Sequence, residues 1–427
     1  MTWAWGNTNL RSCLVIVLVS GALALATLSL ARAPQAVAAD YNDGTDTWQY
    51  TASGSTATIT GCSTCAGAIT IPSTVTDGSA TYNSTDIGVF AFNNKSSITS
   101  VNVPSGVTGI GAFAFGDSTN LTSVTLPSGV TSIGTNAFGN TALVSVTIPD
   151  SVTTMGAGAF YHVPTLTSLT LGTGLTSIPD EAFKETALTS ITIPSGVTSI
   201  GPGAFKDTPL TSIALPNTVT TIGYSAFQND PLTSASLGTG LVTIGDNAFS
   251  GTSLTSITIP NSVTSLGRSA FDSVSSLTSV TLGTGLTNIS NGAFQGTGLT
   301  SVTIPSGVTT IGPSAFNGTR LTSVSLPSTL TTIDDYAFRN TTALTSITIP
   351  ASVTYLGTGA FSFSAPSGSL TSVTFLGNAP TAGASFPYYC GDTVFCNTTG
   401  LASLSIPSSA TGWPTPPATW EGIPTAY

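Results

Sequence analysis

The residues best suited to chemistry in this chain are Cys62 and Cys65, which form the sequence Cys-Ser-Thr-Cys. Two cysteines at this spacing can form a redox-active pair, half of a zinc site or a structural disulfide. The sequence contains no second pair of this spacing, and its only histidine, His162, lies far along the chain. We therefore expect a disulfide, because the redox and zinc hypotheses lack partner residues.

Residues that could carry out acid–base or nucleophilic catalysis are few. A histidine-based triad would have to use His162, which occupies a variable position where we expect a solvent-facing or packed side chain. The acidic pairs at 180–181 and 334–335 fall in variable stretches that predict solvated loops, with calcium binding as an alternative. The sequence has no GxSxG, HExxH or phosphate-loop motif. We predict no enzyme activity, catalytic residue, cofactor or metal site.

The charge balance of the chain argues against nucleic acid as a partner. It has 8 Lys and Arg against 18 Asp and Glu, for a formal net charge of −10. Two of the basic residues, Arg11 and Arg32, lie near the N-terminus, and the other six are scattered. Binding to nucleic acid or to an acidic membrane surface requires clustered basic residues. We therefore predict neither partner.

The N-terminal segment has the features of an export signal. Arg11 precedes an uninterrupted small and apolar run at residues 14–31, and Ala36-Val37-Ala38 follows. We expect cleavage after Ala38 or Ala39 and a secreted or cell-surface protein. The alternative is an uncleaved anchor, because eighteen apolar residues reach the lower limit for spanning a bilayer. The chain would contact a membrane only if this segment is retained.

Four of the five cysteines lie outside the predicted export signal, and export makes disulfides their default state. They form two pairs, each close in sequence, at opposite ends of the chain. We predict disulfides in the two end regions, formed by Cys62, Cys65, Cys390 and Cys396.

The dipeptide Ala-Phe recurs thirteen times at a spacing of 22 or 23 residues. Its phenylalanines are Phe92, Phe115, Phe138, Phe160, Phe183, Phe205, Phe227, Phe249, Phe271, Phe294, Phe316, Phe338 and Phe361. A period held this tightly indicates a solenoid, and its length lies within the leucine-rich-repeat range. We place these rings in the core, with those from Phe138 to Phe338 as its predicted centre.

One copy of the repeat, residues 299–320, shows how a coil is built. Val302 and Ile304 alternate with Ser301 and Thr303, which predicts a strand with aliphatic side chains inward and hydroxyls outward. Pro305 ends the strand, since proline cannot donate to a ladder. A second short extended piece at 308–311 and a helical or irregular turn carrying Ala-Phe complete the coil.

The outward strand positions form the candidate binding face. They are Ser123, Thr125, Ser145, Thr147, Ser190, Thr192, Ser256, Thr258, Ser301, Thr303, Ser346 and Thr348. Few aromatic or arginine side chains interrupt them, although such residues anchor most interfaces.

We predict an α/β, β-rich leucine-rich-repeat solenoid with one long parallel sheet, about 13–15 coils and a cap at each end. The expected divisions are a secretion signal at 1–39, an N-terminal cap at 40–80, the repeat solenoid at 81–376 and a C-terminal cap at 377–427. Trp413 and Trp420 lie in the proline-rich tail. We expect this tail to cover the last coil, with a ligand for another module as the alternative.

The repeated string LTSVTIPSGVTSIGxxAF resembles the BspA-like leucine-rich repeats, also called the Treponema-type class. The resemblance covers roughly residues 46–427, including end segments similar to those of the family. One departure is threonine where family repeats often carry cysteine, which makes the core there more polar. These threonines are Thr141, Thr186, Thr208, Thr252 and Thr319. The resemblance implies extracellular adhesion and brings no catalytic residue with it.

Three functional hypotheses follow. The first is binding of an extracellular protein or glycan, with a specific epitope at the variable positions before Ala-Phe or in the caps. The second takes the Ser and Thr face as a rigid lattice of hydroxyls that binds ice or a repetitive polysaccharide. The third is a structural surface or spacer protein without a discrete ligand.

Overall fold

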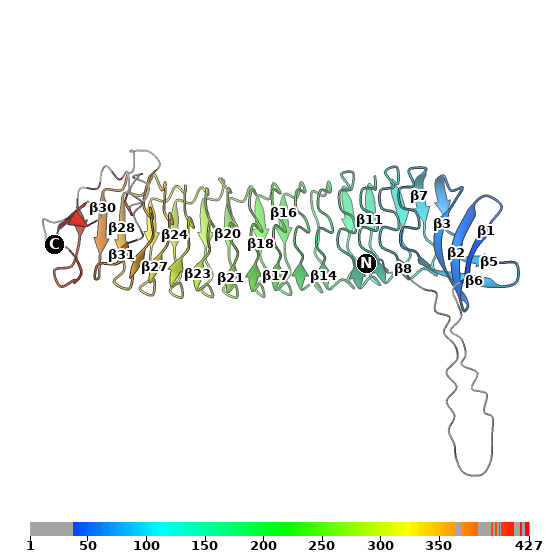
Figure 1. The fold of residues 1–427 in the computed structure, drawn as a ribbon, viewed down its shortest axis with the longest axis horizontal. Coiled ribbons are helices and arrows are strands. Elements are labelled where there is room, and N and C mark those ends of the chain that lie inside the picture. The colour runs from blue at the N-terminus through cyan, green and yellow to red at the C-terminus, as the bar shows by residue number, and fades with distance from the viewer. Residues whose placement is uncertain are drawn as a thin grey trace, which may run out of the picture. The chain divides into compact units, whose positions relative to one another are not determined.

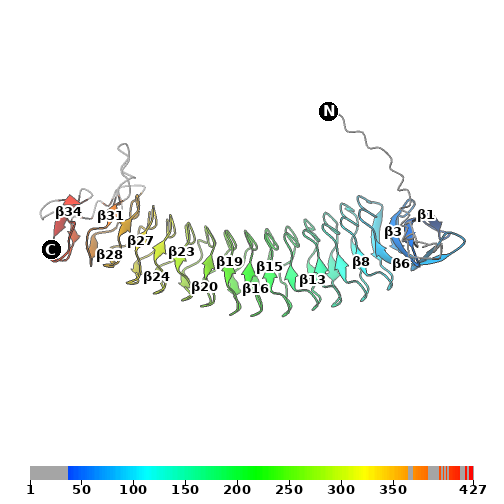
Figure 2. The ribbon, with the colours of Figure 1, turned by 60° about the horizontal axis from the view of Figure 1, so that its bottom comes forward.

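The computed structural model describes residues 37–363, 369–382, 394–395, 398, 401, 403–413, 419–420 and 423–426. Residues 36–427 form one unit, and its described part is a parallel-sheet β-solenoid of about 14 turns. The predicted export signal lies outside the described residues, apart from its last three. Successive coils follow one another in chain order from β8 (Gly109–Ile110) to β31 (Thr381–Ala382) (Figures 1 and 2).

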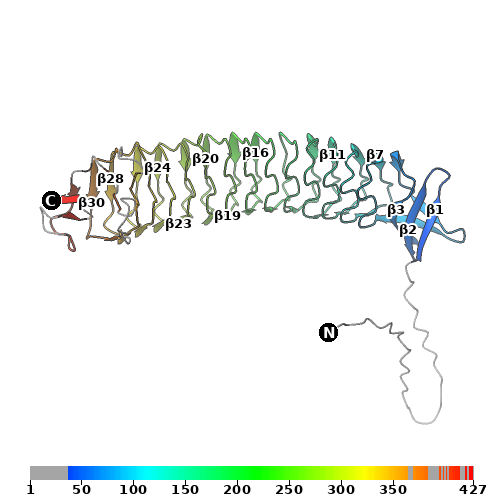
Figure 3. The same cartoon turned by 45° about the horizontal axis from the view of Figure 1, so that its top comes forward.

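Each coil has three sides, shown here for residues 299–320. The long-strand side holds β24 (Ser301–Thr303), and the short-strand side holds β25 (Thr310–Ile311). The Ala-Phe side runs from three residues before the repeated phenylalanine to two residues after it, 313–318 in this coil. Figure 3 shows the long strands β7 to β28 along one edge and the short strands β19 and β23 along the other.

The strands of the long-strand side are β7 (Ile98–Asn102), β9 (Ser123–Thr125), β11 (Ser145–Thr147), β13 (Ser168–Thr170), β16 (Ser212–Ala214), β18 (Ser234–Ser236), β20 (Ser256–Thr258), β22 (Ser279–Thr281), β24, β26 (Ser323–Ser325), β28 (Ser346–Ile349), β30 (Ser372–Phe375) and β32 (Leu404–Ser405). Those of the short-strand side are β8, β10 (Ser132–Ile133), β12 (Thr154–Met155), β14 (Ser177–Ile178), β15 (Ser199–Ile200), β17 (Thr221–Ile222), β19 (Thr243–Ile244), β21 (Ser265–Leu266), β23 (Asn288–Ile289), β25, β27 (Thr332–Ile333), β29 (Tyr355–Leu356) and β31. Both sides are parallel ladders that pair equivalent residues of neighbouring coils, such as Ser145 with Ser168 and Ile244 with Leu266. The expected sheet is thus present on two sides of the coil, and its ladder on the long-strand side is divided into segments.

Antiparallel strands precede the first coils. They include β1 (Val37–Asn42), β2 (Thr47–Ser53), β3 (Thr56–Cys62) and β5 (Thr74–Thr76). β1, β2 and β3 form an antiparallel meander. β3 then pairs in parallel with β6 (Thr81–Ile87), which continues into the short-strand ladder, and β4 (Gly67–Thr70) starts the long-strand ladder by pairing with β7. At the other end, β32 pairs with β34 (Ile423–Ala426), which pairs with β33 (Thr419–Trp420).

The α part of the expected α/β class is wrong. The Ala-Phe side, where a helical turn is one of the two expectations, is a non-helical turn in every described coil. In the coils from Phe92 to Phe338, the residues two before and two after the phenylalanine are left-handed, as at Ser314 (φ +53°) and Gly318 (φ +70°). The amide of Phe316 donates to the carbonyl of Ala337 in the next coil at 2.8 Å. A helix would instead bond its amides within the coil, so no helix forms in the described residues. Accordingly, nothing in this part of the chain is a helix able to cross a membrane.

The repeated phenylalanines form one continuous stack along the core. Neighbouring ring centroids from Phe92 to Phe361 are 5.1–5.8 Å apart, and the predicted core rings from Phe138 to Phe338 have no exposed surface. The stack continues to Phe395, 5.7 Å from Phe361, and Trp48 meets its other end edge-on. Phe395 is not evident from the repeat pattern, because Val394 replaces the alanine and the spacing is longer there.

Most threonines in the core are satisfied locally, and the exception is Thr208, whose buried hydroxyl has no partner among the described residues. The hydroxyls of Thr141, Thr186, Thr252 and Thr319 each donate to the carbonyl of the phenylalanine three residues earlier, at 2.8–2.9 Å. A hydroxyl with a partner can be buried at little cost. The polar core implied by the family resemblance therefore contains its own hydrogen bonds.

Asp230 occupies this threonine position in its coil and is fully buried. The amide of Thr208 donates to one carboxyl oxygen at 2.8 Å, while the other oxygen has no partner among the described residues. Burial raises the pKa of Asp230 from 3.8 to about 8, against the lowering effect of the hydrogen bond from the Thr208 amide. The folded protein therefore holds this carboxyl protonated at neutral pH.

Replacing Asp230 with threonine tests this environment. The unfolded chain loses the Asp230 proton near pH 4, but the folded chain keeps it until about pH 8, so stability falls as pH rises between these values. We expect Asp230→Thr to remove this fall and to raise the free energy of unfolding at pH 8 by about 2–4 kcal/mol. Denaturant unfolding of both proteins at pH 4 to 8 measures this free energy. Asp40→Asn, at an exposed carboxylate, is the control. Parallel pH profiles for wild type and Asp230→Thr would contradict the prediction.

Candidate binding site

The twelve predicted Ser and Thr positions on the long-strand side are all exposed. Ten of them lie in strands, but Ser190 and Thr192 lie in a coil without a long strand. The ladder is also divided between β18 and β20, β22 and β24, and β26 and β28. The hydroxyl face is therefore regular within short segments.

The Ala-Phe side carries the more varied side chains. Its left-handed positions are mostly Asn, Asp, Gly or Ser, which suit that backbone conformation. The exceptions are Phe90, Phe113, His162, Glu181, Glu185 and Tyr336. Bulky residues in this conformation are strained, and such strain marks functional positions. Most of these exceptions fall in two places.

The first place is an apolar ridge made by Val89, Phe90 and Phe113. Val89 is 59% and Phe90 57% exposed, and the rings of Phe90 and Phe113 stack with centroids 5.0 Å apart. The φ angles of the two phenylalanines are +58° and +55°. Exposed aromatic side chains in a polar surround are typical anchors of protein interfaces. From the sequence, these positions belong to the variable stretch before Ala-Phe, and nothing in the repeat pattern distinguishes them.

The second place is a charged cluster in the coils of Phe160 and Phe183. Lys184 lies 3.2 Å from Glu181 and 3.9 Å from Glu185, and its ammonium sits over the ring of Tyr161, 5.2 Å from the centroid. Partial burial lowers the pKa of Lys184, but the hydrogen bond to Glu181 and the neighbouring charges outweigh this effect and raise it. Lys184 is therefore held as a cation. His162 is exposed, and its Nδ1 lies 2.6 Å from Glu185.

A groove opens beside this cluster, with a volume of about 320 Å³. Its lining is formed by Ala157, Asp180, Glu181, Lys184, Pro202, Gly203, Lys206, Tyr224 and Ser225. Gly203 stands where the neighbouring coils carry Glu181 and Ser225, so the missing side chain leaves the hollow. The acids at 180–181, which the sequence placed in a solvated loop, thus line a groove. Asp334 and Asp335 instead accept backbone hydrogen bonds, from Asp335 and Thr358 respectively.

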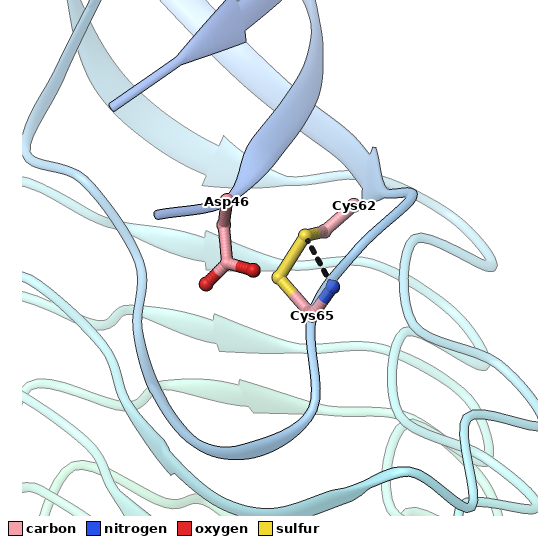
Figure 4. A group of neighbouring side chains, drawn as sticks. All are labelled: Asp46, Cys62 and Cys65. Atoms are coloured by element: carbon pink, nitrogen blue, oxygen red, sulfur yellow. Dashed lines mark hydrogen bonds between the residues drawn. A yellow bond between two sulfur atoms is a disulfide. The ribbon is translucent and has the colours of Figure 1, made fainter. Parts of the chain in front are cut away.

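Cys62 and Cys65 form a disulfide next to the Asp46 carboxylate, as Figure 4 shows. The amide of Cys65 donates to the Cys62 sulfur at 3.1 Å, and the Thr64 hydroxyl donates to Asp46 at 3.0 Å. Within the described residues, Asp46, Cys62 and Cys65 are the only group of three such side chains close enough to share a metal ion. Because the two sulfurs are bonded to each other, the pair is a structural disulfide that closes the turn after β3. Cys390 and Cys396 lie outside the described residues.

The fold and the repeat define a leucine-rich-repeat solenoid. The sequence pattern described as "BspA type Leucine rich repeat region (6 copies)" matches residues 85–209, 198–320 and 287–414. The chain therefore belongs to the BspA-type leucine-rich-repeat family.

Solved structures of bacterial proteins resemble the chain. A leucine-rich repeat protein from Bacteroides ovatus is 23% identical, with a TM-score of 0.59 over 87% of this chain and 95% of its own. A leucine rich cell surface protein from Faecalibacterium prausnitzii is 26% identical, with a TM-score of 0.43 over 80% and 95%. The pneumococcal vaccine antigen PcpA is 18% identical, with a TM-score of 0.44 over 87% and 88%. No curated protein matches the chain. The first of these structures shows that the fold is shared.

The strain at Phe90 can be measured with two substitutions. Phe90→Asn and Phe90→Ala both remove the exposed ring, but only asparagine suits the left-handed backbone. We expect the free energy of unfolding of Phe90→Asn to exceed that of Phe90→Ala by about 0.5–1 kcal/mol. The same two substitutions at Val144, which is exposed and not left-handed, should show no such advantage for asparagine. Equal stabilities at position 90 would contradict the strain argument.

Proposed function

We propose that this chain is a secreted or cell-surface adhesion protein that binds an extracellular protein through its Ala-Phe side and carries out no catalysis. The observation that carries this proposal is the apolar ridge of Val89, Phe90 and Phe113, which is exposed although two of its residues strain the backbone. The contact between the two rings offsets part of the strain, but it leaves Val89 and Phe90 exposed, so a partner that buries them is a physical reason to keep them. The export signal predicted from the sequence and the Cys62–Cys65 disulfide support an extracellular location.

The size of the ridge limits what it can do alone. Stable protein interfaces bury about 1,200–2,000 Å² in total, and a few aromatic anchors within them supply most of the affinity. Three apolar side chains suit an anchor within a larger contact. The rest of the contact is polar, because the Ala-Phe sides of the following coils carry asparagine, glycine and charged side chains.

The double variant Phe90→Asn, Phe113→Asn tests this function. Both substitutions introduce a residue that other coils carry at the same position, so the fold is retained. Surface plasmon resonance against a panel of immobilised matrix and cell-surface proteins identifies the proteins that wild type binds. We expect each of them to bind the variant at least roughly tenfold more weakly. Ser314→Asn, at the equivalent position of a distant coil, should bind as wild type does. Unchanged binding of the double variant would disprove the anchor, and a panel without any binder would favour the spacer hypothesis.

The alternative, a hydroxyl lattice that binds ice or a repetitive polysaccharide, is supported by the register of the long strands. Ser145 pairs with Ser168 and Thr147 with Thr170, so equivalent hydroxyls lie side by side on neighbouring coils. If this lattice binds ice, wild type should show thermal hysteresis, and Thr147→Lys should reduce it by interrupting the flat face. Absence of hysteresis and of recrystallisation inhibition at high protein concentration would remove ice binding.

A further inference from the structure

The groove beside the charged cluster combines four kinds of group within 320 Å³. Lys206 supplies a cation, Asp180 an acceptor, Ser225 a hydroxyl and Tyr224 an aromatic ring. The volume falls within the usual range of small-molecule sites, about 300–1,000 Å³. Three neighbouring coils supply these four residues, so the groove exists only in the stacked solenoid.

The charges in the groove are unequally matched. Glu181 and Lys184 neutralise each other at 3.2 Å, whereas the Lys206 ammonium and the Asp180 carboxylate have no ion-pair partner among the described residues. Lys206 is half-buried, and Asp180 is exposed. An ammonium that is partly removed from water and unpaired favours an anionic group on a ligand. The Asp180 carboxylate, which also lines the groove, favours hydroxyl donors rather than a second anion.

Two further residues point to an occupant. The Ser225 hydroxyl is buried, at 1% exposure, and has no hydrogen-bond partner among the described residues. Buried hydroxyls are normally paired, so an unpaired one lining a groove indicates a missing partner. Tyr224 is 56% exposed and supplies an aromatic surface on the groove wall. Aromatic surfaces of this kind bind the apolar face of a ring.

We propose that this groove binds a carboxylated sugar, with its carboxylate at Lys206 and Ser225, its ring against Tyr224 and its hydroxyls donating to Asp180. A rigid sugar acid carries the anion, the hydroxyl donors and the apolar face on one six-membered ring, which matches the grouping in the groove. A peptide carboxylate would satisfy Lys206 but would leave the Asp180 carboxylate without an array of hydroxyl donors. This sugar site does not depend on the apolar ridge, so it goes beyond the protein binding proposed above.

The test is titration of the purified protein with glucuronic acid and N-acetylneuraminic acid, with glucose and galactose as neutral controls, followed by protein-detected NMR. We expect millimolar dissociation constants for at least one acidic sugar and at least roughly tenfold weaker binding of the neutral ones. Binding should also weaken as salt is raised, because the ammonium and the carboxylate are partly exposed. A glucuronic-acid-terminated disaccharide separates the two sources of the ligand. Tighter binding than the free acid indicates a glycan chain, and equal binding indicates the free sugar.

Three variants place the ligand in the groove. Lys206→Gln should weaken binding at least roughly tenfold, while Lys95→Gln, which removes the same charge elsewhere, should not. Gly203→Asn should abolish binding, because asparagine suits the left-handed backbone at φ +60° and its side chain would fill the hollow, while its Cβ would meet only the flexible Glu181 side chain. Ser225→Gly should weaken binding and retain the fold, since the hydroxyl is unpaired and glycine suits the left-handed backbone at φ +52°.

The proposal is overturned by any of three results. These are neutral sugars binding as tightly as acidic ones, Gly203→Asn binding as wild type does, and no acidic sugar binding at about 20 mM, well above a millimolar dissociation constant. An N-acetylated aspartyl peptide that binds where the sugars fail would assign the groove to an acidic peptide instead. Loss of protein binding in the Phe90→Asn, Phe113→Asn variant leaves this test unaffected, because the ridge and the groove share no residue.

Discussion

The structure depends on one constraint, which is that every coil must place its phenylalanine directly on the ring of the coil before it. The ring centroids are 5.1–5.8 Å apart, close to the spacing of about 4.8 Å between paired strands. Backbone hydrogen bonds between coils run along all three sides. A coil of the wrong length would break both the stack and the ladders, so variation in length is confined to one corner.

That corner lies between the phenylalanine and the first leucine of the next coil. Leu188 lies five positions after Phe183, but Leu166 lies six positions after Phe160. From that leucine to the next phenylalanine the distance is the same in both coils, so the extra residue always enters at this corner. The period of 22 or 23 residues therefore reflects a fixed frame with one adjustable bend. Beyond Phe361 the insertion is larger, yet Phe395 still joins the stack.

The sequence is sufficient to predict the frame because the frame depends on residues that repeat. The period follows from the thirteen recurrences of Ala-Phe, and the buried rings and outward hydroxyls follow from the pattern within one copy of the repeat. The turn on the Ala-Phe side was less predictable, because Ala-Phe by itself is compatible with a short helix. The left-handed residues on both sides of it exclude a helix, and a single coil gives no warning of the hydrogen bonds to its neighbour.

The candidate sites were harder to predict because they depend on differences between coils. The groove requires Gly203 to leave a gap between Glu181 and Ser225, which lie 22 residues away on either side. The proximity of Asp46 to the cysteine pair depends on the pairing of β2 with β3. Asp230 is distinguishable in the sequence only by comparison with the threonines at the same position of other coils.

The abundance of threonine also has a structural explanation that bears on function. The hydroxyls of Thr122 and Thr233 donate to backbone carbonyls of the preceding coil at 3.0–3.2 Å, next to the long strands. Thr131, next to a short strand, does the same at 3.1 Å. Part of the hydroxyl-rich surface is thus accounted for by coil stacking. Many side chains of the Ala-Phe side are not explained by stacking in this way, because the backbone ladder there forms with polar, charged and aromatic residues alike. Selection for a ligand can act there at the cost of local backbone strain, and the left-handed residues other than glycine in the described part of the chain all lie on this side.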